Sequence, residues 1–232
     1  MPEIKVLCSG AFRPAYLELV PSFERSTGHK VVTAWGSSVA GAPTSIPNRL
    51  ERGEPVDLVI MAGSGLDKLI AARLIAAGSR VDLAGSGVGV AVRAGAPRPD
   101  LTSAETLRRA LLSARSVAHS SSASGVYIKG LLERLGVTAA LGNRIRQVEG
   151  EPVGRVVARG EAEIGFQQVS ELLPVAGIDY VGPLPAEIQE ITMFSAGLAA
   201  AAKEPDGAKA LVGWLTAPAA APIIRRSGME PA

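Results

Sequence analysis

The sequence has little of the side-chain chemistry on which several classes of protein depend. Its 232 residues include a single cysteine, Cys8, so no disulfide can form within the chain. Cys8 lies in the short apolar run IKVLCSG, which predicts a buried strand, and a small core residue is expected there rather than a nucleophile. The two histidines lie far apart, which leaves no recognisable zinc constellation. We therefore predict no metal and no other cofactor.

Aromatic residues and excess charge are also scarce. Aromatics make up 4% of the chain, too few and too scattered for a platform on which bases stack. The 24 Lys and Arg nearly balance the 22 Asp and Glu, which leaves a net charge of +2, and no run of like charge exceeds a few residues. Neither nucleic acid nor a membrane surface is therefore an expected partner.

Long apolar runs are missing as well. No stretch of ~18 apolar residues occurs, and the chain opens without a basic segment followed by an apolar one. We therefore expect no membrane insertion. We also expect the protein to be a monomer. The chain as written is expected in the cytoplasm, whereas a chain from which a signal peptide had been removed would be expected in the periplasm.

What the sequence does have is an alternation of short apolar runs with helical patterns. In the first third of the chain, this order predicts a parallel sheet covered by helices. The expected strands are 4–9, 30–36 and 56–63, and the expected helices are 14–28, 44–53 and 66–78.

The pattern changes at residues 81–97, a long glycine-rich extended segment suited to crossing from one sheet to another. A second series of strands and helices follows, and then a return strand over 191–200 and two closing helices within 206–228. We predict an α/β fold of two lobes, each a mostly parallel sheet flanked by helices, with a ligand cleft between them. The first lobe is expected over 1–84 plus 195–232, and the second over 85–194.

Three turns that follow expected strands combine serine with glycine. They are SGAFRP at 9–14, WGSSVAG at 35–41 and HSSSASG at 119–125. Backbone N–H groups at a helix N-terminus carry about half a positive charge and can hold an anion without lysine or arginine. For any single turn, a serine that caps the helix is the alternative. Because the topology brings the three turns together, we favour an anion site.

Arg13 and two glutamines add to this pattern. Arg13 stands in the first turn of a helix, where a cation is electrostatically unfavourable. It is either a bidentate carboxylate ligand or a solvated side chain. Gln167 and Gln168 end a strand in which side chains alternate, so only one of the two can face the cleft.

These segments resemble the molybdate-binding proteins of ABC transporters. The resemblance covers nearly the whole chain and implies the type II periplasmic-binding-protein fold, in which two α/β lobes close on an oxyanion. It also implies an ABC transporter permease as a partner. The segments that carry it are VLCSGAFRPAYLELVPSFERSTGHKV, WGSS, GEPVDLVIMAG, SASGVYIKGLLERLG and RGEAEIGFQQ.

The resemblance also implies a set of ligand-binding residues, with two departures from the family. Ala11 stands where the family has a serine in the first turn, and Gln168 stands where it has a tyrosine. These losses, together with the added Arg13, favour a larger and more carboxylated anion, such as a di- or tricarboxylate, over tetrahedral molybdate. The predicted ligand-binding residues are Ser9, Gly10, Ala11, Arg13, Ser37, Ser38, Ser122, Ser124, Val153 and Gln168.

Two segments, SSSASGVY and ARGEAEIGFQQVSELLPVAGIDYVGPLP, are similar to an offshoot of this family, the aconitate isomerases. That likeness implies cis/trans isomerisation of aconitate by allylic proton transfer, which requires a base. The nearest titratable candidates are His119 and Glu151, each with a structural role as its alternative. Two functions stay open: a solute-binding protein that holds a small polyanion, and an aconitate isomerase-like enzyme.

Overall fold

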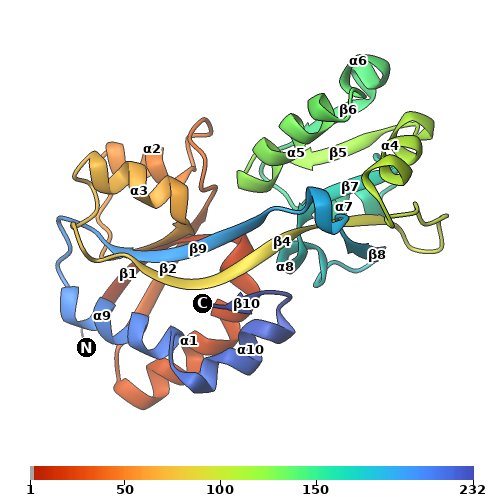
Figure 1. Cartoon of the computed structure of the whole chain (residues 1–232). Helices are drawn as coiled ribbons and strands as arrows, with labels where there is room; N and C mark the ends of the chain where they lie inside the picture. The colour runs from red at the N-terminus through yellow and green to blue at the C-terminus, as the bar shows by residue number, and fades with distance from the viewer. Residues whose placement is uncertain (1–2) are drawn as a thin grey trace. The chain divides into compact units, whose positions relative to one another are not determined.

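The computed structural model describes residues 3–232, which divide into two compact units. Unit 1 comprises the residues up to Ser86 together with Thr192–Ala232, and unit 2 comprises Gly87–Ile191. The chain passes from unit 1 to unit 2 along the strand β4 (Val81–Arg93) and returns at the start of β9 (Ile191–Leu198), as Figure 1 shows. The sequence predicts these divisions after residues 84 and 194.

Unit 1 is built on a sheet with three parallel strands. The central strand β1 (Glu3–Ser9) is parallel to β2 (Lys30–Gly36) on one side and to β3 (Leu58–Ala62) on the other. β9 runs antiparallel to β3, and the short β10 (Glu230–Pro231) runs antiparallel to β4. β3 is buried over its whole length, as its continuous apolar run predicts.

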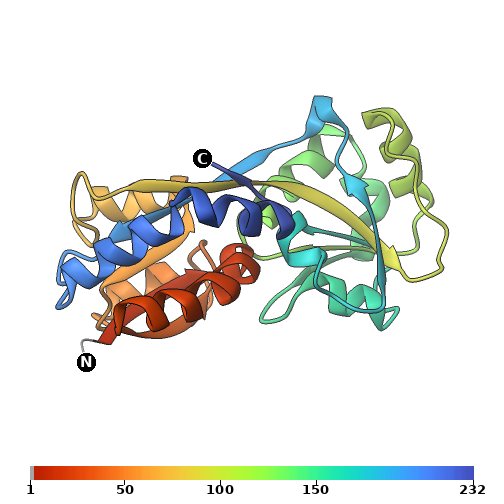
Figure 2. The same ribbon diagram turned by 90° about the horizontal axis from the view of Figure 1, so that it is seen from below.

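One face of this sheet is covered by α1 (Arg13–Thr27), α9 (Pro205–Leu215) and α10 (Ala221–Arg226). These helices lie side by side in Figures 1 and 2, and α1 contacts both of the others. Phe23 of α1 meets Trp214 of α9 edge-on, with 6.0 Å between the ring centroids. The C-terminal segment therefore completes the core that the first β-α unit begins.

The opposite face is covered by α2 (Ile46–Glu51) and α3 (Gly63–Ala71). The sequence-based prediction of a helix over 66–78 is wrong at both ends. The helix is followed by Arg73, whose φ of 60° is left-handed, and Ile75 forms an isolated antiparallel bridge beyond the end of β9. Ile75 thus joins the apolar core under α2 and α3 from an extended segment. Its spacing from the apolar residues of α3 is the spacing expected of one more helical turn.

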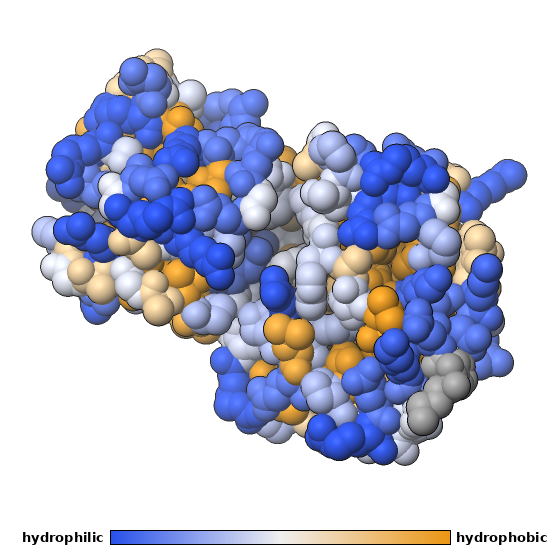
Figure 3. Space-filling view, turned by 180° about the vertical axis from the view of Figure 1, so that it is seen from behind, coloured by the Kyte–Doolittle hydropathy of each residue, from blue (hydrophilic) through white to orange (hydrophobic). Residues whose placement is uncertain are grey.

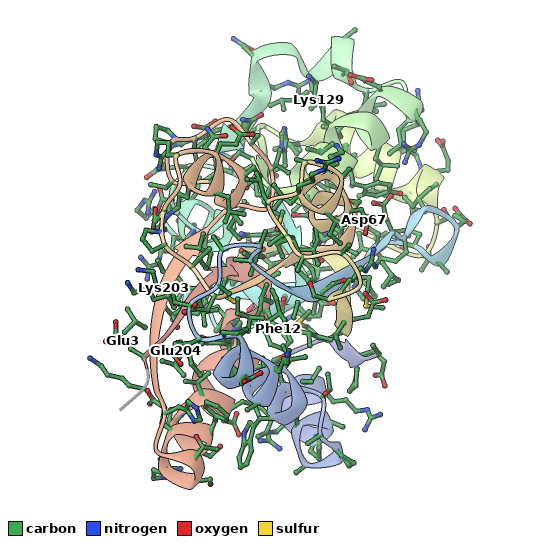
Figure 4. All side chains as sticks on the ribbon, turned by 90° about the vertical axis from the view of Figure 1, so that its left-hand side faces the viewer. Glu3, Phe12, Asp67, Lys129, Lys203 and Glu204 are labelled. Carbon is green, nitrogen blue, oxygen red and sulfur yellow. The ribbon has the colours of Figure 1, made fainter. Side chains whose placement is uncertain are left out.

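Asp57, just before β3, fastens unit 1 together through backbone amides. Its buried carboxylate accepts the Lys5 amide at 2.8 Å and the amides of Lys203 and Glu204 at 2.7 and 2.9 Å. Figure 4 labels Lys203 and Glu204 at the beginning of α9. One side chain therefore joins the start of β3 to β1 and to the N-terminus of α9.

We expect Asp57→Ala to lower the free energy of unfolding by about 3 kcal/mol or more, because it leaves three amides without their acceptor. Urea denaturation followed by circular dichroism measures the loss. The matched control is Asp206→Ala, on the exposed first turn of α9, which should stay within about 0.5 kcal/mol of the unsubstituted protein. Equal losses in the two variants would contradict the role given to Asp57.

Unit 2 repeats the arrangement of three parallel strands. β5 (Val117–Ser120) is parallel to both β6 (Ile145–Val148) and β7 (Ile164–Gln168). β4 runs antiparallel to β7, and β8 (Ile178–Pro183) runs antiparallel to β4. Each unit thus combines a parallel centre with antiparallel strands, which confirms the predicted α/β class.

Helices also cover both faces of the unit 2 sheet. The larger core contains side chains of α4 (Ala104–Ser113), α5 (Ala123–Arg134) and α6 (Thr138–Leu141), and the smaller core contains those of α7 (Val153–Ala158). The short helix α8 (Val169–Leu172) contacts α7 and β7. The remaining short helices of the described residues are the 3-10 turns Gly10–Phe12, Gly142–Arg144, Ala186–Ile188 and Pro218–Ala220.

On the face drawn in Figure 3, hydrophilic residues cover most of the surface of each unit, and hydrophobic ones reach it in small groups. Within residues 3–232, no single helix has the length and apolar composition needed to cross a membrane. The helical segments Pro205–Leu215 and Pro218–Arg226 reach that length and composition only when taken together, and they are bent by 57°.

Candidate functional site

In unit 1, the carboxyl ends of the three parallel strands meet along one edge of the sheet. The register pairs Ser9 with Gly36 and Cys8 with Ile60, so the chain leaves the three strands at neighbouring positions. This is the edge at which sheets of this kind usually bind ligands. The predicted residues at or just beyond this edge are Ser9, Gly10, Ala11, Arg13, Ser37 and Ser38.

The two serines that follow β2 both accept hydrogen bonds from backbone amides. Ser38 Oγ accepts from the Ala62 amide at 3.0 Å, and Ser37 Oγ accepts from the Val39 amide at 3.1 Å. A serine hydroxyl has one proton to donate besides its acceptor lone pairs. Both hydroxyl protons are therefore left for another acceptor, and Ser38 is held in place by the start of α3.

The turn after β1 has fewer side-chain groups available to a ligand than its sequence indicates. Ser9 stands at the N-cap of the turn Gly10–Phe12, where its side chain makes no capping bond. The side chain of Ala11 is buried, so this residue has only its backbone to present to a ligand.

Arg13 is the exposed cation of this edge. Its Cζ lies 4.8 Å from the centroid of the Trp35 ring, and Trp35 meets Tyr16 edge-on. The first turn of α1 contains no acidic residue, and no residue within 3–232 forms an ion pair with Arg13. The guanidinium is thus positioned by an aromatic face while its N–H donors stay available for a carboxylate.

In unit 2, the serine turn follows β5 and packs its hydroxyls against one another. Ser120 Oγ lies 2.8 Å from Ser122 Oγ and 3.1 Å from Ser124 Oγ, and it also accepts the Ser122 amide at 3.3 Å. Ser120 and Ser124 are buried. The serines therefore form a small hydrogen-bonded cluster centred on Ser120.

This cluster leaves the N-terminus of α5 without a side-chain cap. Ser122 occupies the N-cap position, but its hydroxyl makes no capping bond. Within the described residues, the amides of Ala123, Ser124 and Gly125 donate to no other group, whereas the next amide, that of Val126, bonds to Ser122 O. The capping alternative is thus wrong for the Ser122 side chain, and three amides at a 12-residue helix remain for an anion.

Gly125 allows this turn to lie against its own helix. An ideal Cβ on Gly125 would stand 1.6 Å from the carbonyl oxygen of Ser120 and 3.1 Å from His119 Nδ1. Any side chain here would displace the Ser120 carbonyl, so the shape of the turn depends on glycine.

The two glutamines at the end of β7 have different surroundings. Gln167 Oε1 accepts the amide of Val153 at 2.7 Å, and the Val153 side chain is buried in the smaller core. The Val153 amide is therefore engaged within unit 2, and Val153 stays a predicted ligand residue. Gln168, which pairs with Val88 across β4, is buried on the opposite side of the strand and stays a predicted ligand residue.

The two titratable residues predicted as base candidates both have structural partners. His119 is buried, and its Nδ1 donates to the carbonyl of Ser120 at 2.9 Å. Burial lowers the pKa of His119, which favours the neutral form of the ring. Glu151 forms two bonds of 2.8 Å with Arg159, and these hydrogen bonds lower the pKa of its carboxyl. The ion pair with Arg159 makes Glu151 a weak base, whereas His119 keeps Nε2 as an acceptor and stays a predicted candidate.

The sequence-based prediction missed Glu171, a half-buried residue on α8. Burial raises the pKa of its carboxyl to about 7, while a hydrogen bond from Gln167 acts in the opposite direction. In sequence, Glu171 looks like an ordinary acid at the start of a helix. Only its burial in the folded chain distinguishes it.

Metal ligands do not gather in the described part of the chain. Within residues 3–232, no group of three or more His, Cys, Asp and Glu side chains is placed to hold a metal ion.

The comparisons with known proteins agree with this architecture. Residues 4–230 match the family model described as bacterial extracellular solute-binding protein. The chain is 44% identical over 229 residues to a Pseudomonas protein named aconitate isomerase, a match that covers 98% of this chain and 87% of that one. It is 27% identical over 236 residues to the molybdate-binding protein of Azotobacter vinelandii, covering 97% and 89% of the two chains.

Solved structures show the same fold. The periplasmic molybdate-binding protein of Azotobacter vinelandii superposes with a TM-score of 0.78 at 24% identity, covering 97% of this chain and 98% of that one. The sulfate-binding protein SubI of Mycobacterium tuberculosis also gives 0.78, at 18% identity, with 100% and 88% covered. The predicted type II binding-protein fold and the resemblance to molybdate-binding proteins are thereby confirmed. The chain belongs to the bacterial extracellular solute-binding protein family.

Proposed function

We propose that this protein binds a small di- or tricarboxylate and catalyses the cis/trans isomerisation of aconitate. The observation that carries the proposal is the likeness, over nearly the whole chain, to the relative named aconitate isomerase. Identity to the molybdate-binding relative is much lower. The proposal thus selects the more specific of the two functions that the sequence leaves open.

The local chemistry of unit 1 supports a carboxylate. The unpaired guanidinium of Arg13 matches the planar, bidentate geometry of that group. Ala11 offers no hydroxyl where the resemblance implies a serine, which favours a ligand other than a compact tetrahedral oxyanion.

The serine turn of unit 2 supports a second anionic contact. Three unpaired amides at the start of α5 can stabilise a carboxylate and the negative charge that develops on it when a neighbouring carbon loses a proton. We predict that one ligand contacts the edges of both units. Substitutions in each unit test the two contacts separately.

A second function is favoured by the description of the family and by the molybdate-binding relative. In this alternative the protein binds its anion and releases it unchanged to a permease.

Proton NMR in deuterated water separates the two functions. The purified protein is incubated with cis-aconitate and, separately, with trans-aconitate. We expect each isomer to yield the other, because an allylic proton shift is reversible. Unchanged spectra with a ligand-dependent rise in melting temperature would contradict isomerisation and leave a receptor. No interaction with either isomer would contradict both carboxylate functions and direct the search to molybdate and sulfate.

Family membership also bears on location and partners. Because the family is described as extracellular, we propose a location outside the cytoplasm, and fractionation of cells that express the protein tests this proposal. An ABC transporter permease is the partner required only by the receptor function. Co-purification with such a permease would favour that function.

A further inference from the structure

We propose that Trp35 is a positioning residue for carboxylate binding, a role that rests on the proposed function because Trp35 acts through Arg13. The register places Trp35 at the ligand edge of unit 1. It pairs with Cys8, one residue before the pair that ends both β1 and β2. Because β1 ends at Ser9 and α1 begins at Arg13, the guanidinium and the indole meet beside this edge.

The ring of Trp35 faces α1 and is held there by its neighbours. It meets the ring of Tyr16 at nearly a right angle, with 5.6 Å between the two centroids. Tyr16 is buried, and its hydroxyl oxygen lies 2.7 Å from Thr33 Oγ1 on the same strand as Trp35. The carbonyl of Trp35 accepts a hydrogen bond from Arg49 Nη1 at 3.4 Å. Both the ring and the backbone of Trp35 are therefore fixed by neighbouring elements.

This fixed ring restricts a long side chain that nothing else holds. Arg13 is exposed, its Cζ lies 4.8 Å from the centroid of the Trp35 ring, and within residues 3–232 no acidic side chain forms an ion pair with it. An arginine that is free in solvent loses rotamer freedom when it binds a ligand, and this loss weakens binding. A guanidinium already held over an aromatic face has lost part of that freedom beforehand. Trp35 therefore strengthens binding without touching the carboxylate.

The contact with the ring leaves the hydrogen-bonding groups of Arg13 available. The face of the indole attracts the cation through its π electrons and accepts none of the bidentate hydrogen bonds that a carboxylate would. The N–H donors lie at the edges of the planar guanidinium, so a carboxylate can bind there while the ring stays against the face. An acidic partner in place of Trp35 would hold the side chain as well, but it would occupy these donors. An aromatic platform thus suits a cation that must be both ordered and free to bind.

Substitutions of Trp35 test this role by calorimetric titration with tricarballylate, a saturated tricarboxylate that cannot isomerise. Trp35→Leu keeps an apolar side chain but removes the ring, and we expect it to raise Kd by about 2- to 30-fold, the range that corresponds to a cation–π contact. Trp35→Phe should recover part of the affinity, because phenylalanine keeps an aromatic face. Equal affinities of Trp35→Leu and the unsubstituted protein would overturn the role of Trp35.

The same substitution in an Arg13→Ala background separates positioning from a general structural effect. If Trp35 acts through Arg13, Trp35→Leu should change Kd by less than about two-fold once the guanidinium is gone. A structural effect of losing the indole would not depend on Arg13. A loss of affinity of the same size in both backgrounds would therefore overturn the positioning role, while binding by the unsubstituted protein would leave the carboxylate function in place.

The fluorescence of Trp35 supplies a second readout. The chain has two tryptophans, and the other, Trp214 of α9, lies against Phe23. In Trp214→Phe, saturating tricarballylate should change the emission of Trp35, because the guanidinium against its ring gains an anionic partner, and adding Arg13→Ala should abolish the change. Trp35→Phe, which retains Trp214, is the matched control and should show no change.

This readout decides if Trp35→Leu does not fold. Binding of tricarballylate to Trp214→Phe without a change in the emission of Trp35 would then overturn the role of Trp35. Absence of any binding of tricarballylate by the unsubstituted protein would overturn carboxylate binding itself, and the role of Trp35 with it.

Discussion

Replacing Gly125 by alanine is expected to lower the free energy of unfolding by about 3 kcal/mol or more, at the upper end of the usual cost of overpacking. The added methyl group would stand 1.6 Å from the carbonyl oxygen of Ser120, a backbone atom that cannot turn away as a side chain can. Either α5 or the turn must move, and the hydroxyl cluster centred on Ser120 moves with it. Urea denaturation measures the loss, and titration with tricarballylate reports whether the turn still binds.

Gly130→Ala is the matched control, because both glycines lie in α5. At Gly130 the nearest atom to an added Cβ is 3.5 Å away, at the flexible end of Arg134, so the methyl group fits. Alanine within a helix is more stable than glycine by about 0.5–1 kcal/mol, and Gly130→Ala should therefore raise stability. The two substitutions are expected to change the free energy of unfolding in opposite directions. A stabilising effect of both would show that the turn does not depend on contact with Gly125.

The strands were the most predictable part of the fold. The apolar run that becomes β3 lies between a charged residue, Asp57, and a glycine, Gly63. The sequence itself therefore indicates where this strand begins and ends. The end of α3 was less predictable, because Ile75 keeps the helical spacing while it forms a bridge next to β9. That bridge joins residues more than a hundred positions apart, and no local pattern contains it.

The positions of the serine turns were predictable, but the roles of their side chains were not. The sequence indicates hydroxyls arranged around an anion, whereas Ser120, Ser122 and Ser124 bond to one another and leave backbone amides free. The local spacing shows that the serines lie near the start of a helix. Which hydroxyl groups form hydrogen bonds with each other depends on the backbone angles of the turn. Whether these serines contact the ligand stays a prediction.

Glu171 shows the same limit for a titratable group. The segment QQVSEL gives no sign that Gln167 will bond to Val153, fourteen residues earlier, or that α7 will cover α8. The basicity of the carboxyl comes from that packing. Resemblance to a family carries over residues that match a motif, and Glu171 belongs to none of the quoted ligand positions.

Arg13→Ala is expected to weaken the binding of tricarballylate by about 1.5–3 kcal/mol, the value of a hydrogen bond to a charged group. This corresponds to roughly a 10- to 150-fold rise in Kd, since each 1.4 kcal/mol is a factor of ten. Arg13→Lys should recover part of the loss, because lysine keeps the charge but not the planar pair of donors. Isothermal titration calorimetry measures all three affinities.

The control is Arg25→Ala, which removes an exposed arginine from the last turn of the same helix. It changes the net charge by the same amount, so a loss common to both variants would come from the overall field of the protein. Arg25, however, lies at the opposite end of α1, where a cation is electrostatically favourable, whereas Arg13 occupies the unfavourable end and stacks on Trp35. A loss confined to Arg13→Ala would mean that this cation is retained at the N-terminus of α1 to bind a carboxylate. Equal affinities of the two variants would remove Arg13 from the site and leave the amides of α5 to bind the anion.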